Sequence, residues 1–210
     1  MSIINALEWR YAVKKFDPKK ILSKEKVSVL KKAFNLTATS YGLQPVKLII
    51  VSNKELQKTL KASSWNQAQV EDASHLLIFC IENEIDDAYI KKYFERVKNI
   101  RNTPDEILAP FQNFLIEDFN RKTTEEIKHW AKNQVYLAMG NLLTVCALEE
   151  IDACPMEGFL PEDYDKILKL DAKGLKSVLV LPIGYRADDD MFAELKKVRK
   201  PLQDSVIEFE

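Results

Sequence analysis

Basic side chains near the two ends of the chain are the first candidates for chemistry. Arg10 and Lys14 lie among apolar residues near the N-terminus, and Lys197 and Arg199 lie in a basic segment near the C-terminus. Paired arginine and lysine side chains can clamp a phosphate group. The five glycines form neither the GxGxxG pattern nor the GxxxxGK[ST] loop that brings backbone N–H groups to phosphates. If the protein binds a nucleotide, we therefore expect side chains to hold its phosphate.

A turn in the C-terminal half is the second candidate. Residues 153–159 read Ala-Cys-Pro-Met-Glu-Gly-Phe and follow the longest helix that the sequence predicts. Thr123 and Glu126 match a capping box, and no proline interrupts the chain from there to Ile151. Because binding residues concentrate on loops that a rigid scaffold positions, this turn is a candidate site. A plain surface turn is the alternative that these residues leave open.

The second half of this helix is unusually apolar. Between Val135 and Leu148 nearly every residue is apolar or small, so no polar stripe is left for solvent. A helix that is apolar all round is buried. The run is shorter than the roughly 20 residues that span a bilayer. The pattern therefore predicts a buried core helix and gives no membrane partner.

Composition narrows the class of protein. The chain has 210 residues, 46% of them apolar and 30% charged, which suits a single globular domain over 1–210. A net charge of −1 and the lack of a basic stripe argue against a nucleic-acid partner. Three cysteines without a CxxC motif and two distant histidines predict reduced thiols and no metal site. No signal peptide is recognisable at the N-terminus, so we expect a cytoplasmic protein.

Helices and strands mix along the chain. Apolar periodicity predicts helices over 3–9, after Ser23, over 53–62, over 66–72 and after Pro161; β-branched or continuous apolar runs predict strands over 46–51, 75–81 and 177–183. The segment 86–119 has a helical pattern that we expect Pro104 and Pro110 to break. Its aromatic residues indicate either packing or a mobile flap over a site. The predicted class is α+β, with helices around a sheet of four or five strands.

Seven segments in order resemble the FMN-dependent nitroreductases, in particular the branch of bacterial oxygen-insensitive NAD(P)H nitroreductase and dihydropteridine reductase. They cover essentially the whole chain: Ile3-Ile4 with Arg10–Asp17, Thr39-Ser40 with Gln44-Pro45, Asp72–His75, Trp130–Leu137, Gly140-Asn141, Pro155–Phe159 and Lys197–Arg199. No one of these motifs is as specific as a set of zinc ligands. Their order and compatible spacing together carry the resemblance.

The resemblance implies a nitroreductase-like fold, with a central, mostly antiparallel sheet, and an FMN site. Arg10, Lys197 and Arg199 match the phosphate ligands, and Lys14 matches the lysine beside the flavin pyrimidine, where a cation stabilises the charge of the reduced ring. The backbone N–H of Glu157 would approach flavin N5. The full implied set of cofactor-binding residues is Arg10, Tyr11, Ala12, Lys14, Thr39, Ser40, Gly42, Asn66, Gln69, Pro155, Met156, Glu157, Gly158, Lys197 and Arg199.

Three positions depart from the family pattern. Ala12 stands where a serine is usual, so a contact there must come from its backbone. Gln69 replaces a lysine of the enteric enzymes, which keeps a hydrogen bond possible and removes a charge. Gly42 stands where an asparagine is expected and lacks that side-chain contact.

The resemblance also implies a homodimer. The long central helix would be buried between the subunits, and Thr39, Ser40 and Gly42 would reach the flavin of the other subunit. The aromatic residue that commonly gates the substrate falls near Ile116. The candidates for the substrate pocket are therefore Tyr41, Phe114, Ile116 and Phe119.

The implied reaction is reduction at the expense of NAD(P)H. Hydride would pass from the nicotinamide to flavin N5, and two electrons would then pass to a nitroaromatic, a quinone or a free flavin in the same pocket. One pocket that serves both partners in turn predicts ping-pong kinetics. No side-chain acid or base is required. The alternatives are a flavin-binding protein without catalysis, or a reductive dehalogenase or enoate reductase on the same scaffold.

Overall fold

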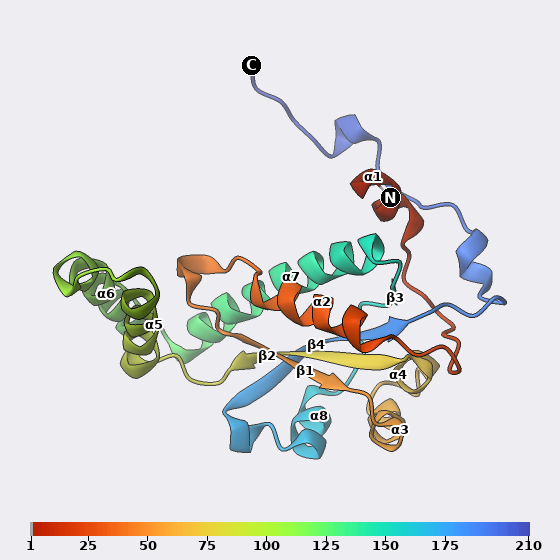
Figure 1. The fold of residues 1–210 in the computed structure, drawn as a ribbon, viewed down its shortest axis with the longest axis horizontal. Helices are drawn as coiled ribbons and strands as arrows, with labels where there is room; N and C mark the ends of the chain where they lie inside the picture. Colours follow the sequence, from red (N-terminus) through yellow and green to blue (C-terminus); the bar gives the residue numbers. More distant parts are fainter. Residues whose placement is uncertain (1) are drawn as a thin grey trace.

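A four-stranded antiparallel sheet separates two layers of helices in the computed structural model, which describes residues 2–210 (Figure 1). The strands lie in the spatial order β1-β2-β4-β3, with bounds Val46–Val51 for β1, His75–Glu82 for β2, Asp152–Ala153 for β3 and Leu175–Gly184 for β4. The helices are α1 Ile3–Trp9, α2 Lys24–Asn35, α3 Lys54–Ala62, α4 Ala68–Asp72, α5 Asp87–Arg101, α6 Asp105–Asn120, α7 Thr124–Leu148 and α8 Pro161–Leu168. The predicted α+β class and antiparallel sheet are confirmed.

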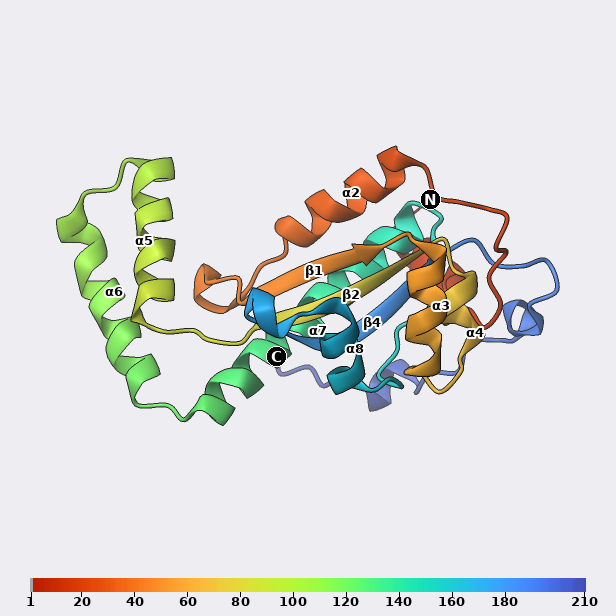
Figure 2. The same cartoon turned by 90° about the horizontal axis from the view of Figure 1, so that it is seen from below.

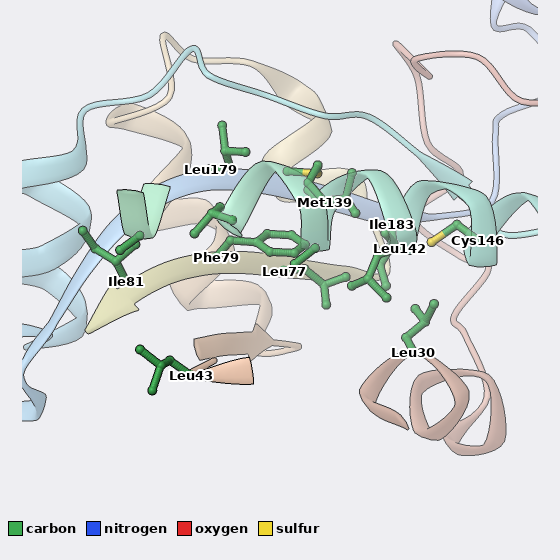
Figure 3. Close-up of a cluster of buried hydrophobic side chains, with 14 of the residues drawn as sticks. Leu30, Leu43, Leu77, Phe79, Ile81, Met139, Leu142, Cys146, Leu179 and Ile183 are labelled. Carbon is green, nitrogen blue, oxygen red and sulfur yellow. The ribbon is translucent and has the colours of Figure 1, made fainter. Parts of the chain in front are cut away.

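Each face of the sheet has its own core, because side chains alternate along a strand. On β2, Leu77 and Phe79 face α2 and α7, where they meet Leu142 (Figure 3). Leu76 and Ile78 face the opposite layer of α3 and α8. Both sets are fully buried. A strand covered on both faces reads as a continuous apolar run, which is the pattern from which β2 was predicted.

The long helix α7 begins where the sequence indicates. The Thr123 side chain accepts from the backbone N–H of Glu126 at 3.2 Å, and the Glu126 carboxylate accepts from the backbone N–H of Thr123 at 2.7 Å. This reciprocal pair is the predicted capping box. The helix ends at Leu148, a few residues before the predicted Ile151.

The chain itself buries α7 on one side only, so the predicted burial all round would require a partner. Ala138 and Leu142 lie in the core, whereas Tyr136 is 50% exposed and Leu137 is 56% exposed. The sheet covers only one face of the helix, so a second apolar face is left uncovered by the chain itself. No helix within residues 2–210 has the length and apolar character needed to cross a membrane.

The segment between β2 and α7 folds as two helices that project from one end of the sheet (Figure 2). Pro104 separates α5 from α6 as predicted, but the predicted break at Pro110 is wrong, because Pro110 lies inside α6. A proline there removes one hydrogen bond, to the carbonyl of Glu106 in the first turn. The packing of Leu115 and Phe119, both buried, holds the rest of the helix to the core.

Candidate functional site

Backbone pairing brings the N-terminal segment alongside the turn after α7. Ala12 forms a parallel bridge with Ala153, and the N–H of Val13 donates to the Ala153 carbonyl at 3.3 Å. On the other side, the N–H groups of Cys154 and Met156 donate to carbonyls of β4 at 3.1 and 2.9 Å. The chain from Ala153 to Met156 is thus held between two neighbours. The candidate turn is therefore fixed to the sheet rather than free at the surface.

A hollow of about 480 Å³ lies where these segments meet the C-terminal arm. Its lining includes Arg10, Ala12, Lys14, Pro155, Lys197 and Arg199, all of them predicted cofactor ligands. Tyr11, a further predicted ligand, and Phe192 complete one wall. Residues from opposite ends of the chain therefore meet at one surface, as the phosphate-clamp hypothesis requires.

Three of the cations that line this hollow, Arg10, Lys197 and Arg199, repel one another. Burial lowers the pKa of Arg10, and the Arg199 guanidinium lowers it further. Burial, Arg10 and Arg199 likewise lower the pKa of Lys197, whose ammonium donates to the Arg10 carbonyl. Within residues 2–210, none of the three forms an ion pair with a carboxylate. Glu8 also lines the hollow and raises the pKa of Lys197, but the cations outnumber it, which suits an anion that the chain itself does not supply.

An aspartate that the sequence analysis did not single out organises the wall of the hollow. Asp190 is buried, and its Oδ2 accepts from the Tyr11 hydroxyl at 3.0 Å and from the backbone N–H groups of Lys14 and Lys15 at 3.0 and 3.2 Å. Its Oδ1 accepts from the N–H of Phe192 at 3.2 Å. Burial raises the pKa of this carboxyl, but the hydrogen bonds outweigh it, so the pKa lies below its usual value. The group is therefore a charged acceptor.

A second buried aspartate, Asp152, holds the side chain of Arg186, which contacts two aromatic rings. The Arg186 guanidinium lies between the rings of Trp9 and Tyr11, at 4.4 and 4.5 Å from their centroids. Asp152 accepts from Nε and from the backbone N–H of Arg186, both at 2.8 Å. Arg186 thus contacts the face of the Tyr11 ring, while Asp190 accepts from its hydroxyl. Tyr11 is held in place by two independent contacts.

The turn at 155–158 is braced from the segment between α3 and α4. Gln67 donates from Nε2 to the Gly158 carbonyl at 2.9 Å. A Cβ on Gly158 would lie 2.9 Å from the Trp65 ring, so glycine is needed for this close approach. The Glu157 carboxylate is exposed and accepts from the Tyr136 hydroxyl of α7 at 2.8 Å. Met156 points into the core, and so its side chain is structural.

Asn66 and Gln69 flank this turn. Asn66 is exposed and has a φ of 56°, a left-handed conformation that asparagine tolerates better than most residues. Gln69 is buried, and it lies near the Cys154 thiol, whose pKa burial raises and Gln69 lowers. The amide that replaces the family's lysine therefore packs against the segment that precedes Pro155.

The predicted ligands Thr39, Ser40 and Gly42 lie elsewhere in the chain. The backbone N–H of Ser40 donates to Gln134 of α7 at 2.9 Å, whereas Arg10 lies beside Cys146. These two helix positions are about 18 Å apart at a rise of 1.5 Å per residue. Thr39 instead lines a larger groove of about 810 Å³ between α2, β1 and α5. One chain therefore does not bring all the predicted ligands together.

The absence of a side chain at position 42 has a structural reason. Gly42 has a φ of 72°, which favours glycine. A Cβ there would lie 2.7 Å from the Tyr93 hydroxyl. Because asparagine tolerates this left-handed conformation, the Tyr93 hydroxyl of α5, rather than the backbone, limits the side chain at this position.

The substrate-pocket candidates divide into two kinds. Phe119 is buried and packs edge-on against Trp130 at 5.1 Å, which is a core contact. Phe114 is 55% exposed and stacks on Phe111, also exposed, at 6.3 Å. Tyr41 touches the Phe111 and Phe119 rings and is partly exposed. Ile116 is half-buried and packs against the core. Tyr41, Phe111 and Phe114, which we call the aromatic face, are the part of this set open to solvent.

Sequence reasoning missed Asp190, Gln67, Trp65 and Phe111. Asp190 closes a run of three acids, which by itself indicates a solvated surface. Its importance depends on contacts with residues 175 to 179 positions away. Phe111 belongs to the aromatic cluster of 86–119, and its position on an exposed helix face is the signal that could have identified it.

The donor set fits an FMN phosphate. Arg10 and Arg199 can each offer forked N–H donors, and Lys197 adds a third positive charge, which suits a doubly charged phosphate monoester. Lys14 and Lys196 line the same hollow. The clustered cations therefore suit the phosphate of the ligand, and further cations are available in the same hollow for its polar ring.

Comparisons with known proteins identify the family. The family model described as "Nitroreductase family" matches residues 7–185. An oxygen-insensitive NAD(P)H nitroreductase of Salmonella typhimurium is 31% identical, over 99% of this chain and 100% of that protein. A major NAD(P)H-flavin oxidoreductase of Aliivibrio fischeri is 34% identical, over 97% of each. A protein of Exiguobacterium sibiricum, solved in complex with FMN, has the same fold with a TM-score of 0.84 and 18% identity, over 100% of this chain and 98% of that one. The chain is an oxidoreductase and belongs to the nitroreductase family.

Proposed function

We propose that this protein is an FMN-dependent NAD(P)H oxidoreductase that reduces nitroaromatics, quinones or related acceptors by a ping-pong mechanism. The observation that carries the proposal is the cluster of Arg10, Lys197 and Arg199 beside a hollow, without carboxylate partners among residues 2–210. A glycine-rich phosphate loop is absent from the sequence, so these side chains take its place.

The chain's own residues bind and orient the cofactor. Arg10, Lys197 and Arg199 hold the phosphate, and Tyr11 and the Ala12 backbone line the path from it towards Pro155. Lys14 places a positive charge beside the ring, where reduction adds negative charge. The N–H of Glu157 is presented by a turn braced through Gln67 and Gly158. When bound, FMN accepts a hydride and passes on two electrons, a chemistry for which the protein needs no side-chain acid or base.

The working unit is a homodimer with shared sites. The exposed apolar face of α7, with Tyr136, Leu137 and Leu148, lies next to exposed Ile4 and Leu7 of α1. Exposed apolar surfaces of this kind mark protein interfaces. A two-fold pairing through α7 would bring the Thr39–Gly42 loop of one chain towards the clamp of its partner, which accounts for their separation within one chain.

The aromatic face belongs on the acceptor side of this shared site. Tyr41 adjoins the Thr39–Ser40 loop, and Phe111 and Phe114 extend the surface along α6. Flat aromatic acceptors stack well on such rings. The same pocket would receive the nicotinamide and then the acceptor, and so we expect the two to compete.

Anaerobic titration tests the catalytic proposal. Holoprotein mixed with NADH or NADPH without oxygen should lose its visible flavin absorbance, and added nitroaromatic or quinone should restore it. A flavin that stays oxidised with both nucleotides would support the alternative of a flavin-binding protein without catalysis. Initial rates at several fixed acceptor concentrations should give parallel double-reciprocal lines, and intersecting lines would contradict the ping-pong order.

Light scattering tests the dimer. The wild type should have twice the 24.2 kDa mass of one chain, and Leu137→Glu should shift it towards the monomer because a charge would replace an apolar contact. Ile100→Glu is the matched control, since Ile100 is also exposed but lies on α5. A wild-type monomer with FMN fully bound would reject the shared site.

A further inference from the structure

The two halves of the phosphate clamp come from opposite ends of the chain, and one carboxylate touches both. Oδ2 of Asp190 accepts from Tyr11, Lys14 and Lys15 of the N-terminal segment. Its Oδ1 accepts from Phe192 at the start of the C-terminal arm, and its carbonyl accepts from the N–H of Ala193 at 2.9 Å. Asp190 is therefore the junction between the segment that bears Arg10 and the arm that bears Arg199.

The arm beyond this junction has little else to hold it. Residues 194–200 are exposed, and within residues 2–210 their hydrogen bonds to other segments are two: the N–H of Leu195 on the Phe192 carbonyl at the start of the arm, and the Lys197 ammonium on the Arg10 carbonyl. Burial and the neighbouring Arg10 and Arg199 lower the pKa of that ammonium, so the contact brings like charges together. Directional bonds at Asp190 must offset this repulsion when no phosphate is bound.

We propose that Asp190 is a positioning residue that couples the N-terminal and C-terminal halves of the phosphate clamp. This inference rests on the proposed function, because it assigns Asp190 to the binding of FMN. The carboxylate does not touch the phosphate itself. It sets the distance between Arg10 and Arg199, so that both can contact one phosphate group.

The chemistry of the carboxylate explains why an aspartate serves here. Two oxygens face four donors, and both oxygens must accept. An asparagine of the same shape turns its NH₂ either towards Phe192 or towards Lys14 and Lys15, so at least one N–H loses its acceptor. Asp190→Asn therefore loosens one half of the clamp with a minimal change in volume.

A double-mutant cycle on the full-length protein tests the coupling. The measured quantity is the Kd of FMN, with the Kd of riboflavin, which lacks the phosphate, as reference. In the wild type, Arg199→Ala should weaken FMN binding by about tenfold to a hundredfold. In the Asp190→Asn background the same change should cost less than about threefold, because Arg199 is no longer held at the phosphate. Equal costs in both backgrounds would overturn the proposal.

The ratio of the two affinities separates positioning from a general loss of structure. Asp190→Asn should lower the preference for FMN over riboflavin by at least about fivefold. A variant that loses both affinities in equal measure would mean that Asp190 supports the fold alone, and would contradict the coupling. Asp188→Asn is the matched control: this neighbouring acid is 98% exposed, and it should leave both affinities unchanged.

A second variant covers the case in which Asp190→Asn does not fold. Asp190→Ser keeps a short acceptor for the N–H of Phe192 but cannot reach Lys14 and Lys15. It should retain the turn at 191–194 and still lower the preference for FMN. A preserved preference in Asp190→Ser would overturn the inference. A wild type that binds neither FMN nor riboflavin would instead reject the proposed function.

Discussion

The clamp at one end of the molecule and the aromatic face at the other are built by different means. At the clamp, Asp190 and Asp152 fix Tyr11 and Arg186 through directional hydrogen bonds of 2.8 to 3.0 Å. At the aromatic face, rings of Tyr41, Phe111 and Phe114 meet at centroid distances of 6.3 to 6.4 Å without a hydrogen bond between them. Directional bonds specify one ligand geometry, whereas ring contacts tolerate several. Under the proposed function, we therefore expect cofactor specificity at the first end and breadth of acceptor at the second.

The largest effect on stability is expected near the aromatic face, where the ring of Phe119 lies in the core. Phe119→Ala should lower the free energy of unfolding by about 3–5 kcal/mol, because it leaves a cavity in the core beside Trp130. Phe114→Ala, at an exposed ring of the same helix, should change stability by less than about 1 kcal/mol. Denaturant unfolding of both variants measures the difference.

In catalysis, the exposed ring should matter: Phe114→Ala should change acceptor kinetics although it hardly changes stability. Phe114→Ala should alter kcat/KM among nitroaromatic and quinone acceptors while the Kd of FMN stays the same. An acceptor profile identical to that of the wild type would remove Phe114 from the acceptor side. The aromatic face would then have no role in acceptor binding.

The next effect concerns the clamp. Arg199→Ala should weaken FMN binding by about tenfold to a hundredfold, since a charge-assisted hydrogen bond to phosphate contributes about 1.5–3 kcal/mol. Riboflavin should bind almost equally to wild type and variant. High salt should narrow the FMN difference, because Arg199 is exposed. Equal losses for FMN and riboflavin would mean that Arg199 supports the fold and that the phosphate assignment is wrong.

A smaller effect is expected at the loop beside the aromatic face. Gly42→Ala should destabilise the protein by about 1–2 kcal/mol through its left-handed backbone, with a further cost from the Tyr93 hydroxyl. Gly174→Ala is the matched control, since Gly174 has a similar φ of 66° and open space around its Cβ. Gly42→Ala should cost more stability than Gly174→Ala, and Tyr93→Phe should remove this difference. An unchanged difference in stability would show that the Tyr93 contact does not select glycine.

The smallest effect tests the electrostatics of the clamp without flavin. Inorganic phosphate at a few times its Kd should stabilise the apoprotein by about 1 kcal/mol, because it neutralises Arg10, Lys197 and Arg199. Chloride at the same ionic strength should do less, and Arg199→Ala should abolish the difference. Thermal unfolding measures all three. Equal stabilisation by phosphate and chloride would indicate simple screening.

Local signals predicted most of the fold. Capping at Thr123 and the continuous apolar run of β2 are patterns within a few residues, and both were confirmed. The predicted break at Pro110 was wrong, because the loss of one hydrogen bond in the first turn of α6 destabilises the helix less than the burial of Leu115 and Phe119 stabilises it. The one-sided burial of α7 depends on which helices and strands cover it, which composition does not express.

The candidate site was predicted in part. The resemblance supplied Arg10 and Arg199, and the structure brings them to one hollow. The sequence did not indicate Asp190, because its hydrogen-bond partners lie 175 to 179 residues away along the chain. An acid at the end of an acidic run has no local sequence pattern that marks it. Function at this end depends on pairing between the ends of the chain, which only the fold creates.

The identity of the bound flavin tests the central claim most directly. Protein purified without added cofactor should be yellow, and denaturation should release FMN in an amount equimolar with the chain. A clamp for one phosphate group, made of Arg10, Lys197 and Arg199, predicts FMN rather than FAD. Release of FAD, or a colourless protein whose addition leaves the spectrum of FMN unchanged, would contradict the account.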